Sequence, residues 1–230
     1  MESLTCRKIP NSREDRVMNY LPHQLQSVEI GDTSDSWGAA GFAVIDGAVR
    51  IGAPRIAFIP TGTRGITRVI ADEVDGTIDG MPFGAANADS LELAAQPNPP
   101  HTNRVIGIDH LVAMSTDVDR TILALQSADI ELRRERRFGE GDDAKRQAFF
   151  WLGDVILELG GPGVAQPGGG AALWGLALTC DDLDLAKDTL GDLLSDPKPA
   201  VQPGRQIATI RTRDLDISVP IALLSPHPAR

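Results

Sequence analysis

An internal repeat constrains the fold of this chain more than any other feature. On either side of the glycine-rich segment 160–170, the sequence carries an apolar stretch, then acidic residues, then an amphipathic stretch. His110 precedes Asp119 by nine residues, and Gly175 precedes Asp184 by the same nine. Each of these aspartates is expected to cap the N-terminus of a helix. The repeat therefore predicts two copies of one supersecondary unit, residues 104–162 and 172–228.

Strand-like segments follow each expected helix, so each copy has the order βαβββ. A single module of this kind leaves one face of its sheet open, and pairing the two modules buries their apolar faces. We therefore expect an α+β fold in which tandem βαβββ modules form a curved mixed sheet around a cleft. The expected strands after the helices are 130–136, 146–152 and 155–159 in the first copy, and a weak one near 200, 206–211 and 219–224 in the second.

A fainter third copy precedes these two. Residues 21–93 begin with strand-like and helix-like segments but are shorter and poorer in helix, which predicts an abbreviated N-terminal module. The proline-rich segment 94–103 is expected to be a linker. Residues 1–20 mix charges with few apolar side chains, so we expect a disordered tail there, with Met18 as an alternative start.

Composition excludes some classes of function. The chain has a net charge of −10 and no basic face, which argues against nucleic-acid binding because phosphate neutralisation supplies most of that affinity. No apolar run is long enough to span a membrane. Cys6 and Cys180 have no metal-binding or redox spacing. We therefore expect a cytoplasmic protein with reduced thiols and a small-molecule partner, and neither nucleic acid nor membrane as a partner.

The motifs IDHLVAMSTDVDRT, ELGGP, WGLALTCDDLDLA and VPIALLSPH, in this order, resemble the glyoxalase/bleomycin-resistance/extradiol-dioxygenase superfamily, also called the vicinal oxygen chelate (VOC) superfamily. The resemblance covers residues 105–226 well and 24–83 weakly. It implies a divalent metal in the cleft, held by a His on the first strand and a Glu on the last strand of each module. His110 and Glu158 match this pattern in the first module. Their counterparts in the second module, in the same order, are Gly175 and Ala222.

His110 and Glu158 have three possible roles. They can form a hydrogen-bonded polar pair in the cavity, or act as catalytic acid and base without a metal. They can also hold one divalent metal ion (Fe, Zn, Ni or Mn) together with a third ligand outside the motif. The candidates for this third ligand are His23, His101 and His227.

Several polar side chains are predicted to contact a ligand at the cleft. Period-two alternation along the strand that begins at Ile130 places Arg134 and Arg136 on the same face as Leu132, where the arginines are in reach of an anionic ligand. Arg133 falls on the opposite face, beside glutamates. The complete predicted set is Arg134, Arg136, Arg146, Gln147, Gln202 and Arg205.

These features favour a protein that binds a small organic molecule in the C-terminal cleft without the complete metal site of the family. The alternative is a divalent-metal-dependent lyase, isomerase or dioxygenase that uses His110 and Glu158. A second alternative is an interaction-only dimeric module. An unpaired third module would leave a sheet without an internal partner, which favours a homodimer.

Overall fold

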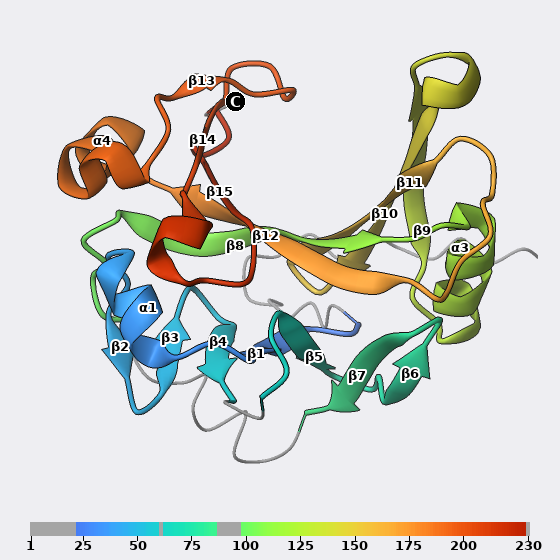
Figure 1. Ribbon diagram of the computed structural model, residues 1–230. Coiled ribbons are helices and arrows are strands. Elements are labelled where there is room, and N and C mark those ends of the chain that lie inside the picture. The colour runs from blue at the N-terminus through green and yellow to red at the C-terminus, as the bar shows by residue number, and fades with distance from the viewer. Residues whose placement is uncertain (1–21, 60–61, 87–97, 229–230) are drawn as a thin grey trace, which may run out of the picture.

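The computed structural model describes residues 22–59, 62–86 and 98–228 (Figure 1). The expected tail, the choice between Met1 and Met18, Cys6 and the first part of the expected linker lie outside the described residues. None of the helices in these ranges is long and apolar enough to cross a membrane.

Two mixed β-sheets with few helices make up the fold, which confirms the predicted α+β class with βαβββ modules. The first sheet has seven strands in the order β2-β3-β4-β1-β5-β7-β6. Its elements are β1 Leu25–Ile30, α1 Ser34–Ala39, β2 Val44–Ile45, β3 Ala48–Arg50, β4 Arg55–Phe58, β5 Ile66–Ala71, β6 Gly76–Ile78 and β7 Met81–Ala85.

The second sheet has eight strands in the order β13-β14-β15-β12-β8-β11-β10-β9. Its first module contains β8 Val105–Met114, α3 Val118–Ser127, β9 Leu132–Phe138, β10 Lys145–Leu152 and β11 Val155–Pro162. Its second module contains β12 Ala172–Cys180, α4 Leu183–Leu190, β13 Lys198–Pro199, β14 Gln206–Thr209 and β15 Ile221–Leu224. Short 3₁₀ turns lie at Gly141–Asp143, Gly191–Leu193 and Thr212–Leu215.

The eight-stranded sheet curves into a cup (Figure 1). Strands β8 and β12 form its floor, β9, β10 and β11 form one wall, and β13, β14 and β15 form the other. The seven-stranded sheet lies below the floor, on the side away from the opening. One hydrophobic core includes buried residues of both sheets and of α1, among them Trp37, Phe83, Leu111 and Leu157.

The two halves of the cup are related by an approximate two-fold axis. Leu111 of β8 pairs with Leu176 of β12 in the antiparallel central pair. The distance along the sequence from Leu111 to Leu176 equals the distance from His110 to Gly175. The axis therefore passes close to the Leu111–Leu176 pair and makes Gly175 the structural counterpart of His110. An added Cβ at Gly175 would lie 3.1 Å from the carbonyl oxygen of Pro220, so the backbone leaves little room for a side chain there.

The same symmetry relates the last strands of the two modules. Glu158 of β11 pairs with Val112 of β8, and Ala222 of β15 pairs with Ala177 of β12. Val112 and Ala177 are themselves counterparts in the two halves. Ala222 is therefore the structural counterpart of Glu158, as the sequence motifs indicate.

The N-terminal sheet holds more than a single module. Strands β1 to β4 with α1 have the βαβββ order, and β4 pairs in parallel with β1 as β11 does with β8. Strands β5 to β7 form a shorter unit without a helix, paired antiparallel to β1 across β5. The first unit therefore has a partner within its own sheet, and the expected reason for a homodimer is absent. The homodimer itself stays a prediction.

The two helices of the C-terminal modules are each capped by an aspartate two residues before the expected one, Asp119 or Asp184. Asp117 caps α3 by accepting the backbone N–H of Arg120 at 3.1 Å, and Asp182 caps α4 by accepting those of Asp184 and Leu185. A capping residue needs extended backbone geometry, which Asp117 and Asp182 have. Asp119 and Asp184 lie in the first helical turn, where their charge complements the helix dipole.

Polar contacts fix the two sheets to each other. The Asp32 carboxylate is fully buried and accepts hydrogen bonds from Trp37 Nε1 at 3.1 Å and from the backbone N–H of Ser218 at 3.0 Å. Asp79, at the turn between β6 and β7, pairs with Arg120 of α3 at 2.8 Å. The seven-stranded sheet thereby supports the floor of the cup from below.

Candidate functional site

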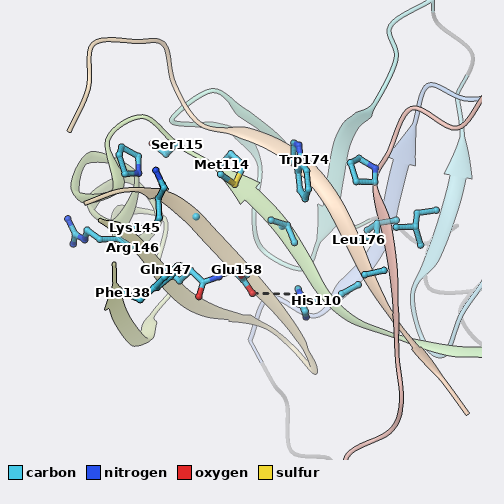
Figure 2. A pocket seen from close by; sticks show the side chains of 18 of the residues that line it. His110, Met114, Ser115, Phe138, Lys145, Arg146, Gln147, Glu158, Trp174 and Leu176 are labelled. Atoms are coloured by element: carbon cyan, nitrogen blue, oxygen red, sulfur yellow. Dashed lines mark hydrogen bonds and ion pairs between the residues drawn. The ribbon is translucent and has the colours of Figure 1, made fainter. Parts of the chain in front are cut away.

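The cup contains two adjoining cavities of about 580 and 540 Å³. Met114 and Trp174 line the first, and Arg134, Phe149 and Gln202 line the second. The residues that line both cavities are His110, Gln147, Glu158, Ala177 and Ala222. Figure 2 shows the first cavity, with His110 and Glu158 pointing toward one another from neighbouring strands.

A β-bulge at Asp109 determines the chemistry of the floor. In the antiparallel pairing of β12 with β8, Ala177 pairs with His110 and Leu178 pairs with Ile108, so Asp109 has no partner residue. Successive residues of a regular strand point to opposite faces, but an extra residue breaks this alternation. The side chains of Asp109 and His110 can therefore contact each other, and the Nδ1 atom of His110 lies 2.7 Å from the Oδ1 atom of Asp109.

Asp109 also binds a buried arginine from the wall formed by β13, β14 and β15. Arg205, just before β14, donates from Nη2 to Asp109 Oδ2 at 2.6 Å, and its side chain is 0% exposed. Burial by itself raises the pKa of Asp109, but the hydrogen bonds from His110 and Arg205 and their charges lower this pKa to about 2. Asp109 is therefore ionised at neutral pH.

The ionised Asp109 fixes the orientation and the tautomer of His110. A carboxylate only accepts hydrogen bonds, so Nδ1 of His110 carries the proton in their shared bond. In the neutral imidazole the lone pair then lies on Nε2, which is 3.7 Å from Oε2 of Glu158. This separation is longer than a hydrogen bond. Nε2 and Glu158 thus present two polar atoms side by side at the floor of the cavity.

A row of polar side chains continues from Glu158 across the wall. Gln147 of β10 donates from Nε2 to Glu158 Oε1 and accepts from Arg136 Nε of β9 at 2.5 Å. Together with Asp109 and His110, these side chains connect β9, β10, β11 and β8 in strand order. Arg205 extends the row to the second wall. The row therefore crosses the floor and joins both halves of the cup.

The structure places the predicted ligand-binding residues in two groups. Arg134, Arg136, Gln147 and Gln202 line the second cavity. The guanidinium groups of Arg146 and Arg205 are engaged elsewhere.

Arg146 lines the first cavity, but its guanidinium is held by Asp119 of α3 at 2.7 Å and by Glu135 at 2.8 Å. Its side chain is 6% exposed. Arg205 is held behind Asp109 and also donates to the carbonyl oxygen of Ser225 at 2.7 Å. Both arginines therefore support the site rather than offering free donors to a ligand.

A second bulge alters the predicted face of Leu132. Phe149 of β10 pairs with Arg134, and Phe150 pairs with Leu132, so the extra residue is Arg133. Leu132 consequently packs against the hydrophobic core instead of lying beside Arg134. Arg133, expected on the opposite face, lines the second cavity together with Arg134.

The three histidines considered as a third metal ligand do not complete a metal site with His110 and Glu158. Both ring nitrogens of His23 face backbone carbonyls, those of Asp72 and Asp129, at 3.2 and 3.1 Å. His101 accepts the backbone N–H of Ala43 at 3.0 Å through Nδ1, and its Nε2 lies 2.8 Å from the carbonyl oxygen of Arg50.

Burial lowers the pKa of His101, which suits a neutral ring in this position. His227 lines the second cavity, but its Nε2 lies 3.2 Å from Nη1 of Arg205. Among the described residues, none of the three forms a group with His110 and Glu158 that could hold a metal ion.

The residues present do not fit the metal site of the family. His110 Nε2 and Glu158 supply two donors from one half of the cup, while Gly175 and Ala222 supply no side-chain donor from the other. In the described ranges, no group of three or more His, Cys, Asp or Glu side chains is placed to hold a metal ion. Zinc and iron sites in proteins use at least three protein ligands as a rule.

The residues of the cup that were not among the predicted contacts include Asp109, Met114, Lys145 and Trp174. Asp109 belongs to the DH dipeptide that carries the family resemblance, but strict alternation puts it on the face opposite His110. Lys145 alternates with Gln147 along β10, so period-two alternation starting from Gln147 would have placed Lys145 on the same face.

No protein-family model matches this chain, and no curated protein matches its sequence. Solved structures do match its fold. A mutant of 4-hydroxymandelate synthase from Streptomyces coelicolor has a TM-score of 0.61 at 13% identity and covers 91% of this chain and 94% of its own. A catechol 2,3-dioxygenase has a TM-score of 0.55 at 13% identity, with 91% and 90% covered.

A xylose isomerase-like TIM barrel/4-hydroxyphenylpyruvate dioxygenase fusion protein has a TM-score of 0.58 at 11% identity and covers 91% of this chain and 49% of its own. Identities this low show the fold alone. The chain thus has a glyoxalase/VOC-type fold, as the sequence motifs predicted, and a coverage of 91% extends the likeness to both sheets.

Proposed function

We propose that this chain binds a small organic molecule in the C-terminal cup and does so without the complete metal site of the VOC fold. One observation carries this proposal. The two-fold axis of the cup relates His110 to Gly175 and Glu158 to Ala222, so half of the expected ligand set has no donor atom.

The size and lining of the cup support a ligand of this kind. Each cavity lies within the range of about 300–1,000 Å³ typical of small-molecule sites. Apolar side chains such as Val112 and Trp174 line the first cavity, and the polar row lies at its floor. A few convergent polar groups in an otherwise apolar cavity orient a ligand and give specificity.

His110 gives the cup the means to move a proton. Its neutral ring can accept a proton at Nε2 from a bound ligand, and Asp109 then stabilises the resulting imidazolium through Nδ1. Oε2 of Glu158, 3.7 Å from Nε2, adds a second negative charge beside that imidazolium. The same residues therefore serve a binding protein or an enzyme that shifts a proton on its ligand.

The test is heteronuclear NMR of the purified protein in the presence of a chelator. A library of small organic fragments is added, and shifts are followed at Gln147, His110 and the Trp174 indole. The proposal expects fragments that shift these signals with divalent metal absent. Fragments that bind only after addition of Fe(II), Zn(II), Ni(II) or Mn(II) would instead support the metal-dependent alternative, and shifts located only outside the cup would overturn the proposal.

A further inference from the structure

Two arginines on the wall of the cup face the cavity without a carboxylate partner. Arg134 and Arg136 line the second cavity, and in the part of the chain that the structure describes neither forms an ion pair. Each lies over an aromatic ring instead. The Arg134 guanidinium is 5.6 Å from the centroid of Phe149, and that of Arg136 is 5.1 Å from the centroid of Phe138.

Other arginines of the same wall do have acidic partners. Arg133 lies 3.9 Å from Glu131, and Arg137 lies 3.4 Å from Glu135. The chain carries 32 acidic against 22 basic residues, so acidic partners are abundant. Within the described ranges these two arginines thus stay unpaired at a cavity of an acidic chain, where their charge is available to an external anion.

The charges of the side chains that line the cup also favour an external anion. Asp109 is neutralised by Arg205, which leaves Glu158 as the one other carboxylate among the residues lining the two cavities. Lys145 also lines the first cavity and has no acidic partner among the described residues. Positive charge thus exceeds negative charge in the cup, although the chain as a whole is acidic.

Aromatic contacts hold the two guanidinium groups in place and leave their donors free. Arg136 uses its Nε atom on Gln147, and no contact within the described ranges uses its Nη atoms. A guanidinium presents its N–H groups in a fixed fork that matches carboxylate and phosphate oxygens. The row from Gln147 to His110 lies beside this fork and can contact the remainder of the same ligand.

From these contacts we infer that the ligand is an organic anion, an apolar or aromatic body that carries a carboxylate or phosphate group bound by Arg134 and Arg136. The inference rests on the proposed function and specifies the class of ligand. The apolar body lies against side chains such as Trp174 and Val112, and the oxyanion lies at β9.

The experiment compares ligands of one shape and different charge. Benzoate and phenyl phosphate are titrated into the protein beside neutral benzamide and cationic benzylamine, with the Gln147 side-chain amide as the NMR probe. We expect the two anions to bind about tenfold or more tightly than benzamide, because hydrogen bonds to a charged acceptor are stronger than those to a neutral one. The ratio of benzoate to phenyl phosphate affinity distinguishes a carboxylate from a phosphate ligand.

Matched variants locate the effect. The double substitution Arg134→Gln with Arg136→Gln should reduce the preference for benzoate over benzamide to within about twofold, because both charged donors are gone. Arg137→Gln, on the same strand but engaged with Glu135, should leave the preference unchanged. Arg136→Lys alone should retain part of it, because the charge remains while the fork is lost.

Equal affinity for benzoate and benzamide in the cup would overturn the anion site but leave the proposed function standing. A preference for anions that survives the double substitution would overturn the assignment to Arg134 and Arg136. No shift with either anion at millimolar concentration would also overturn the anion site. Shifts that map outside the cup for every probe would contradict the proposed function as well.

Discussion

Asp109 and Trp174 occupy equivalent positions in the two halves of the eight-stranded sheet, and each is a bulged residue of its strand. In the pairing of β8 with β12, neither Asp109 nor Trp174 has a partner residue on the other strand. The two-fold axis that relates His110 to Gly175 also relates Asp109 to Trp174. The repeated fold thus provides the same irregularity twice. One copy carries a carboxylate that orients His110, and the other carries an indole that lines the cavity.

Asp109 should be necessary for stability because it neutralises a buried arginine. Asp109→Ala leaves the guanidinium of Arg205 buried without a counter-charge, which should lower the free energy of unfolding by about 3–5 kcal/mol. The pair of the exposed Asp196 with the partly buried Lys187, at 3.2 Å, is the matched control. Asp196→Ala should cost less than about 1 kcal/mol in the same urea titration. Similar losses in the two variants would contradict a structural role for Asp109.

The contribution of Asp109 should depend on pH with a defined sign. Its pKa in the folded protein is about 2, below the value of about 3.9 for an unperturbed Asp. The stabilisation from ionised Asp109 is therefore full above about pH 4 and is lost as the pH falls through about 2. The difference in urea midpoint between wild type and Asp109→Asn should shrink over this interval. A difference that stays constant down to about pH 2 would show that the charge of Asp109 is not its source.

Cys180 should be unreactive while the protein is folded. Its side chain is fully buried, and burial raises the pKa of the thiol to about 11. Only the thiolate is nucleophilic, so a disulfide reagent at mildly alkaline pH should modify Cys180 in a Cys6→Ser variant only after addition of denaturant. Rapid modification without denaturant would show that β12 opens readily or that Cys180 is accessible.

A third metal ligand introduced at Ala222, the counterpart of Glu158 in the second module, should raise the affinity of the cup for a metal ion. Ala222→Glu puts a carboxylate at the position where the second module lacks one, and Ala222→Gln is the uncharged control. We expect zinc affinity to rise by roughly tenfold or more in Ala222→Glu, because zinc sites use at least three protein ligands. Competition with a chromophoric chelator measures this. Unchanged affinity, or a gain that persists when His110 is replaced by Ala, would contradict the assigned geometry.

The two modules of the eight-stranded sheet could be predicted from the sequence, because the sequence repeat corresponds to the two-fold symmetry of that sheet. Residues at equal distances from the two helix starts became counterparts in the sheet, so the match of His110 to Gly175 followed from spacing alone. The same holds for Glu158 and Ala222, which pair with equivalent residues of the central strands. The two cap positions were predicted wrongly because two aspartates lie two residues apart at each helix start, and composition alone does not tell which of them is the cap.

The site was less predictable because it depends on irregularities. A bulge adds one residue without a compositional mark, so alternation placed Asp109 away from His110 and placed Leu132 beside Arg134. The burial of Arg146 and Arg205 was hidden for a related reason. Their partners, Asp119 and Asp109, come from segments distant in sequence, and only tertiary packing brings them together.

The metal content of the purified protein shows whether the cup holds a complete metal site. The protein is purified without added ions or chelators, and its elements are measured by plasma mass spectrometry beside the His110→Ala variant. We expect no stoichiometric Fe, Zn, Ni or Mn in either sample. About one equivalent of one of these metals per chain in the wild type, lost in His110→Ala, would contradict this expectation and would identify His110 as a ligand in a complete metal site.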